Sequence, residues 1–121
     1  MEIDRASLQQ SLVVLRQGLH QLRAIALNAP LDLPALQQAS RNVQHSFQQE
    51  LELAETLETE ALPAPLTAIH TEMNRLMRLL KVDVMGVQTA RQVETTQQRL
   101  GQLGDRITRL LEFCDGAISL F

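Results

Sequence analysis

The sequence predicts an all-α protein built as an antiparallel, up-down four-helix bundle. Apolar residues recur at alternating intervals of three and four along four stretches of similar length, a spacing that keeps one face of an α-helix against a partner. Hydrophobic residues make up 45% of the 121 residues and aromatic residues only 2%, so the core must consist of aliphatic side chains, as in helix bundles. Short connectors make consecutive helices pack antiparallel. The same spacing also suits an alternative, in which long helical hairpins assemble as a coiled-coil dimer.

The first helix is expected over residues 5–28. Asp4 or Ser7 can cap its free backbone N–H groups. Pro30 ends it, because proline has no N–H to donate and disfavours helical geometry in the residue before it. Asp32 is then the expected cap of the next helix, with Pro34 in its first turn. The apolar stripe of the first helix consists of Leu8, Leu12, Leu15, Leu19, Leu22 and Ala26.

The second helix is expected over residues 33–61. Glu50 falls on its apolar stripe at strict spacing, although a small drift of the helix would bring Leu51 to the core instead. Two prolines, Pro63 and Pro65, end this helix and start the next. The stripe of the second helix consists of Leu36, Val43, Phe47, Ala54, Leu57 and Ala61.

The third and fourth helices, expected over residues 64–90 and 94–119, form a long hairpin. Gly101 and Gly104 lie inside the fourth helix, where each costs about 1 kcal/mol relative to alanine. We expect them to let residues 82–85 of the third helix pack closely. The inward residues are Leu66, Ile69, Met73, Leu76, Leu80 and Val87 on the third helix and Leu100, Leu103, Ile107, Leu110 and Cys114 on the fourth.

Composition and charge argue against several classes of protein. A chain of this mass, 1–121, is expected to form a single helical domain. Its net charge of −3 and its few aromatic side chains disfavour nucleic-acid binding. The single cysteine, Cys114, cannot form an intrachain disulfide, and no apolar run approaches the roughly 18 residues of a membrane span. We therefore expect a cytoplasmic protein without a nucleic-acid or membrane partner.

Few residues point to chemistry. His20, His45 and His70 fall at equal intervals of 25 on three helices, but helical rise does not bring them level across the hairpins. None follows a glutamate by three positions, so the Glu-x-x-His motif of di-iron bundles is absent. Cys114 lies on an apolar stripe without a base at helical spacing. We expect surface or flanking histidines, no metal, no cofactor and no enzymatic activity.

Asp83 is the unusual residue of the third helix. Strict spacing from Leu80 to Val87 places its carboxylate on the buried face, where a charge needs a partner. Reversal of the chain between the last two helices brings Arg99 within reach, so an Asp83–Arg99 pair is one interpretation. In the other, the helix changes phase at Gly86 and turns Asp83 outward.

Charged residues are unevenly distributed. Glutamates crowd the end of the second helix, and some are expected to pair internally, for instance Glu50 with Arg75. Arginines lie on the last two helices, either as a solvated face or as a basic strip that docks an acidic or amphipathic peptide. Under the second interpretation the partner-binding residues are Arg78, Asp83, Arg91, Arg99 and Arg106, with Asp83 fixing the geometry.

The C-terminal part of the chain resembles a known family. The run 79–85, Leu-Leu-Lys-Val-Asp-Val-Met, together with segments 88–92, 98–100, 104–106 and 113–115, resembles the cyanobacterial heterocyst frequency control protein PatD. The resemblance implies a small, cytoplasmic, non-enzymatic regulator of cell division and heterocyst frequency. Such a protein would bind the tubulin-like protein FtsZ and alter its assembly. The alternative is a structural or self-assembling coiled-coil protein without an FtsZ role, for which a homodimer is expected.

Overall fold

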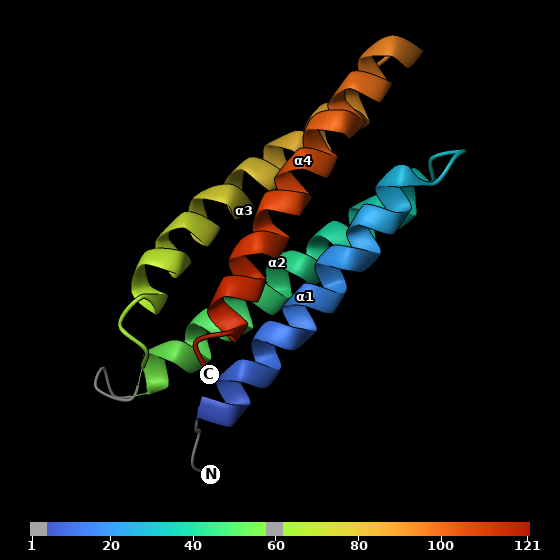
Figure 1. The fold of residues 1–121 in the computed structure, drawn as a ribbon. Coiled ribbons are helices and arrows are strands. Elements are labelled where there is room, and N and C mark those ends of the chain that lie inside the picture. The colour runs from blue at the N-terminus through green and yellow to red at the C-terminus, as the bar shows by residue number, and fades with distance from the viewer. Residues whose placement is uncertain (1–4, 58–61) are drawn as a thin grey trace.

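The computed structural model describes residues 5–57 and 62–121, and these form four α-helices and no strand. The helices are α1 (Arg5–Leu27), α2 (Leu33–Thr56), α3 (Leu66–Thr89) and α4 (Val93–Ile118). They run alternately up and down, with the C-terminus and the α2–α3 connection at one end of the bundle and the α3–α4 turn at the other (Figure 1). The predicted four-helix bundle is therefore confirmed.

The four interhelical seams differ in extent. α1 packs closely on both α2 and α4, and α3 packs closely on α4, whereas α2 and α3 touch least. The bundle thus consists of two tight hairpins, α1–α2 and α3–α4, which are joined mainly where α1 meets α4. The α1–α2 connection and the α3–α4 turn lie at the same end (Figure 1).

The predicted apolar stripes form the core. All the stripe residues of α1 are buried, and the α4 stripe is buried from Leu103 to Cys114. A large cluster fills most of the bundle, and a smaller one lies at the end near both termini. The smaller cluster contains Leu8, Leu12, Ala54, Leu66 and Ala117. Among the described residues, no helix carries a stretch apolar enough to cross a bilayer.

Helix ends follow the capping residues more closely than the apolar pattern. The Asp32 carboxylate accepts a hydrogen bond of 3.1 Å from the Ala35 N–H, as predicted for the α2 cap. α2 ends at Thr56, not near residue 61, because Leu57 is extended and its N–H bonds the Ala54 carbonyl. α3 starts at Leu66 rather than residue 64, because Pro65 is its N-cap. Asp4 and Ala61, the predicted cap and stripe residues, lie outside the described residues.

The predicted role of two glycines is wrong. A Cβ added at Gly101 or Gly104 would meet no atom within 4 Å, so neither residue allows a close approach of α3. The tight position is Gly86 on α3, where an added Cβ would lie 2.8 Å from Arg99 Nη1. Gly86 therefore makes room for a side chain of α4 rather than for its backbone.

Candidate functional site

Asp83 and Arg106 form an ion pair between α3 and α4. Arg106 Nε donates to Asp83 Oδ2 over 2.9 Å, and the Asp83 side chain is only 10% exposed. The first interpretation of Asp83 is right that the carboxylate is largely buried and pairs with an arginine of α4, but wrong about which arginine; the second is wrong, because the carboxylate does not turn outward. Arg99 instead donates from Nη1 to the Gly86 carbonyl oxygen over 3.1 Å.

The direction in which helical side chains lean explains this exchange of partners. Side chains lean toward the N-terminus of their own helix. Because α3 and α4 are antiparallel, Asp83 leans away from the α3–α4 turn while Arg99 and Arg106 lean toward it. The Arg106 side chain therefore approaches Asp83 from the side away from the α3–α4 turn. The Arg99 side chain extends past the level of Asp83 toward the turn and reaches Gly86. If residues of α3 and α4 are matched by their height along the helix axes alone, without this lean, Arg99 is selected as the partner of Asp83 instead of Arg106.

The five predicted partner-binding residues do not form one continuous strip. Asp83, Arg99 and Arg106 hold α3 and α4 together. Arg78, on the outer face of α3, and Arg91, in the α3–α4 turn, are exposed and form no ion pair with any residue in 5–57 or 62–121. Only these two of the five remain available to a partner.

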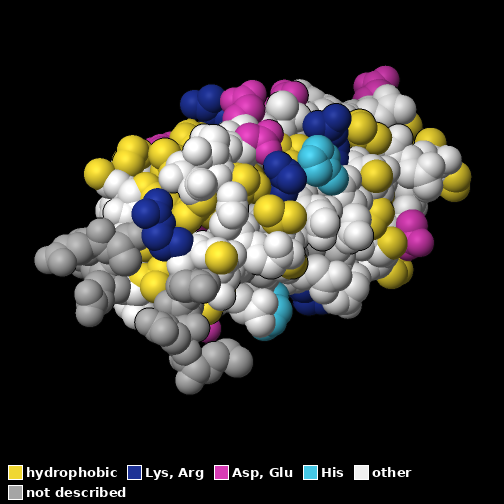
Figure 2. Space-filling model, turned by 60° about the horizontal axis from the view of Figure 1, so that its bottom comes forward, with side chains coloured by type: hydrophobic (Ala, Val, Ile, Leu, Met, Phe, Trp, Pro, Cys, Tyr) yellow, Lys and Arg dark blue, Asp and Glu magenta, His cyan; other side chains and the backbone are white. Residues whose placement is uncertain are grey.

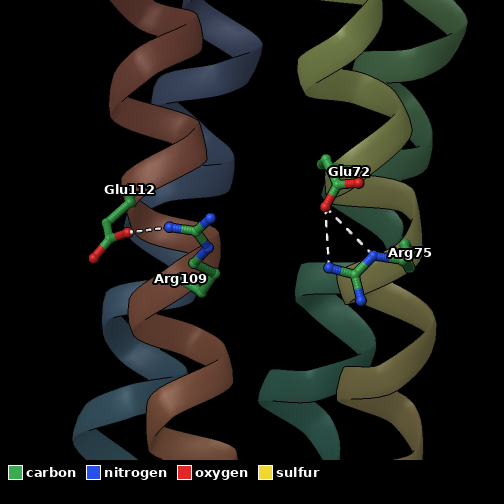
Figure 3. Close-up of polar contacts among 4 residues, drawn as sticks. All are labelled: Glu72, Arg75, Arg109 and Glu112. Atoms are coloured by element: carbon green, nitrogen blue, oxygen red, sulfur yellow. Dashed lines mark hydrogen bonds and ion pairs between the residues drawn. The ribbon is translucent and has the colours of Figure 1, made fainter.

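Glu50 keeps its place on the apolar face of α2 and is fully buried. His70 Nε2 on α3 lies 2.6 Å from Glu50 Oε1, whereas Oε2 has no hydrogen-bond partner among the described residues. The predicted Glu50–Arg75 pair is wrong, because Arg75 binds Glu72 one turn away over 3.0 Å (Figure 3). The alternative with Leu51 in the core is wrong too, since Leu51 is only half-buried.

The buried thiol of Cys114 lies in the same electrostatic environment. Burial, and to a smaller extent the charges of Glu50 and Asp115, raise the pKa of Cys114 from its ordinary 9.0 to about 12, while Arg16 opposes the rise. The thiol therefore stays protonated at neutral pH and is a poor nucleophile. Within the described part of the chain, no group of three His, Cys, Asp or Glu side chains is arranged to hold a metal ion.

The three histidines differ. His20 and His45 are exposed, as expected, whereas the His70 side chain is only 14% exposed because it reaches Glu50. The sequence signal for this pair is the glutamate on an apolar stripe, which demands a polar partner. The His70–Glu50 contact links α2 to α3, which share the least extensive of the four interhelical seams.

A shallow groove lies between α2 and α3, toward the end with the α3–α4 turn. Its volume is about 220 Å³. It was not predicted, because the spacing of apolar residues does not show where two packed helices move apart. Its lining residues are Gln37, Ser40 and Arg41 from α2 and Lys81, Val84, Met85 and Gln88 from α3.

Exposed apolar side chains gather at the same end. Val82 and Met85 on α3 are 63% and 61% exposed, and Val93 at the start of α4 and Leu27 at the end of α1 are exposed as well. Figure 2 turns the opposite end, with the termini, toward the viewer, and on the face that it draws hydrophobic side chains are interspersed with polar ones. The groove and its charges therefore locate a candidate site better than apolar surface alone does.

Comparison with known proteins adds no further constraint. No protein-family model, curated protein or solved structure matches the chain. The class of protein that fold and surface define is thus a four-helix bundle with a partly basic, partly apolar α3 end.

Proposed function

We propose that this chain is a non-enzymatic regulatory protein that acts by binding another protein. The observation that carries the proposal is the outer face of α3, where Val82 and Met85 are exposed beside Arg78 and Lys81. Arg91 adds a further exposed cation in the turn that follows. Protein interfaces combine exposed apolar side chains with charges that steer and orient the partner.

The proposed partner is FtsZ, as the PatD resemblance implies. The chain would act in the cytoplasm, altering FtsZ assembly and thereby cell division and, in filamentous species, heterocyst frequency. The exposed cations support an electrostatic contact with an acidic surface, because unpaired charges at an interface rim raise the association rate.

Sedimentation of polymerising FtsZ with and without this protein tests the proposal. The decisive variant is Arg78→Glu/Arg91→Glu, because these two arginines make no ion pair within the described structure. A control with the same change in net charge is Arg5→Glu/Arg109→Glu on α1 and α4, which breaks the exposed Arg109–Glu112 pair and the contacts of the two arginines with Phe121 and Phe113. Arg99 and Arg106 are unsuitable, because reversing them would disturb the α3–α4 hairpin itself.

We expect the wild-type protein and the control to co-pellet with FtsZ or change its polymer yield, and to do so less as salt increases. The decisive variant should lose most of this effect while keeping the helical circular dichroism of the wild type. FtsZ binding would be contradicted if, at every salt concentration, this protein does not co-pellet with FtsZ and does not change the FtsZ polymer yield. Pelleting of the chain without FtsZ would favour the self-assembling coiled-coil alternative.

A further inference from the structure

The α2–α3 seam is bridged along only part of its length. Glu50 meets His70 near the α2–α3 connection, and one turn and a half further on the Gln44 side-chain amide donates to the Met77 carbonyl oxygen over 3.0 Å. Beyond Gln44, toward the α3–α4 turn, no hydrogen bond or ion pair between described residues joins α2 to α3. The groove occupies this unbridged part of the seam.

The walls of the groove carry positive charge. Arg41 stands on the α2 wall and Lys81 on the α3 wall, and no acidic residue of the described chain is among the lining residues. Arg41 donates to the uncharged Gln38 side chain over 2.9 Å, so its charge is not neutralised. The exposed glutamates of α2, Glu52 and Glu55, lie at the opposite end of that helix. The groove is thus complementary to a negatively charged ligand.

The groove also offers apolar contact. Val84 is 5% exposed and forms part of the floor, while Met85 stands on the rim with 61% exposed. The flexible, polarisable thioether of methionine adapts to differently shaped apolar side chains, which is why methionine is common at peptide-binding surfaces. An occupant therefore needs at least one apolar side chain in addition to negative charge.

The dimensions limit the size of the occupant. On α3 the lining residues extend from Lys81 to Gln88, which corresponds to roughly 10 Å of helix at about 1.5 Å per residue. The volume of about 220 Å³ is below that of pockets for drug-sized ligands, which hold about 300–1,000 Å³. A short peptide segment fits this size better than a cofactor.

We propose that the α2–α3 groove binds a short acidic segment of a partner protein. An apolar side chain of the segment packs against Val84 and Met85, and flanking carboxylates pair with Arg41 and Lys81. This inference rests on the proposed protein-binding function and deepens it by naming the site and the chemistry of the partner. Arg41, which the sequence did not single out, becomes a binding residue.

Selection from a random library of displayed peptides of about 12 residues, long enough for three helical turns, tests the inference without FtsZ. The full chain is the bait. Binding of the selected peptides is then measured for the wild type, for Arg41→Glu/Lys81→Glu, and for the control Arg5→Glu/Arg109→Glu. Circular dichroism and the urea midpoint show whether each variant is folded.

We expect the selected peptides to share carboxylates on either side of an apolar residue. Their affinity should fall about tenfold or more in the groove variant, should be unchanged in the control, and should decrease with salt. Peptides that are neutral or basic, or that bind the folded groove variant as well as the wild type, would overturn the inference. Recovery of no peptide would overturn it too.

A second copy of this chain is the competing occupant. Its signature is a dimer in sedimentation equilibrium that dissociates in the groove variant, and this outcome would contradict a partner peptide. The two proposals fail separately. If acidic peptides are selected but the protein has no effect on FtsZ, the groove remains a peptide-binding site and FtsZ is rejected as the partner. If Arg41→Glu/Lys81→Glu still co-pellets with FtsZ, FtsZ remains the partner and the groove is rejected as the binding site.

Discussion

Glu50 shows how one residue can oppose the pattern of its helix. It is fully buried among aliphatic side chains, and only one of its carboxylate oxygens has a partner in the described structure. A buried charge that keeps a single partner is costly, and removing that partner costs more than removing both together. His70 is therefore the residue on which the cost of burying Glu50 depends.

The substitution His70→Leu should lower the free energy of unfolding by about 2 to 3 kcal/mol, because the buried Glu50 carboxyl group then has no hydrogen-bond partner. The double substitution Glu50→Leu/His70→Leu should restore it to within about 1 kcal/mol of the wild type, since an apolar pair replaces the polar one. Urea denaturation at pH 7 measures both values.

The exposed His45 on α2 supplies the control. His45→Leu should change the free energy of unfolding by less than about 0.5 kcal/mol, as is usual at the surface. If the double variant is as unstable as His70→Leu, the contact between Glu50 and His70 does not explain the loss.

Cys114 makes stability depend on alkaline pH. Its pKa is about 12 in the folded protein, above the ordinary 9.0. Below pH 9 both states hold the proton; between pH 9 and 12 the unfolded chain releases it while the folded chain keeps it. The free energy of unfolding should therefore fall by about 1.4 kcal/mol per pH unit in this range. Urea denaturation between pH 8 and about 11 measures the slope.

The variant Cys114→Ala isolates this effect. Its stability is lower at neutral pH because a buried side chain is shortened, but its slope above pH 9 should be flatter. The chain suits the experiment, because it has no tyrosine and Lys81 is its single lysine, so few other side chains titrate in this range. Equal slopes in the two proteins would show that the thiol is not responsible.

At the scale of elements, α3 and α4 are held together by side chains that cross between them as well as by their apolar seam. Arg106→Gln should destabilise the protein by about 1 to 2 kcal/mol, because the Asp83 carboxylate is 10% exposed and would lose its charged partner. Thermal or urea unfolding measures this loss.

Arg109 on the same helix is the matched control. It pairs with Glu112 one turn away, and both side chains are 60% exposed (Figure 3). Exposed pairs of this kind contribute little, so Arg109→Gln should cost less than about 0.5 kcal/mol. Similar losses in the two variants would mean that burial of the Asp83 pair has no energetic effect.

Helix positions were predictable from the sequence, because proline, the Asp32 cap and the spacing of leucines act locally. The contacts between helices were not. The partner of Asp83 depends on how side chains lean on antiparallel helices, and the roles of Gly86 and Gly101 depend on which face each presents. Periodicity also located Glu50 on the core face, but it did not identify His70 as the partner.

Of the candidate site, the sequence predicted the basic character of the C-terminal half and the two arginines that remain exposed, Arg78 and Arg91. It missed Arg41, because that residue joins the site only through the space between α2 and α3. Such space depends on the relative placement of whole helices.

At the scale of the whole molecule, the four interhelical seams differ in their roles: some bury the core and one forms the groove. The close α1–α2, α1–α4 and α3–α4 seams bury most of the core, whereas the α2–α3 seam is open enough to form a groove. Charge follows the same division, with exposed glutamates at one end of α2 and Arg41 and Lys81 facing each other toward the other.

The burial of Glu50 also affects how the helices align. Leu36, Val43 and Glu50 occupy the same heptad position in successive repeats of α2, so an otherwise apolar position carries one carboxylate. If α2 moved by one heptad toward the α3–α4 turn, Glu50 would lie level with Met77 instead of His70. The thioether of Met77 has no proton to donate. Leucine stripes alone tolerate such a slide, but the contact with His70 exists in a single alignment. We therefore expect this pair to select one register of the bundle among several that would bury the leucines equally well.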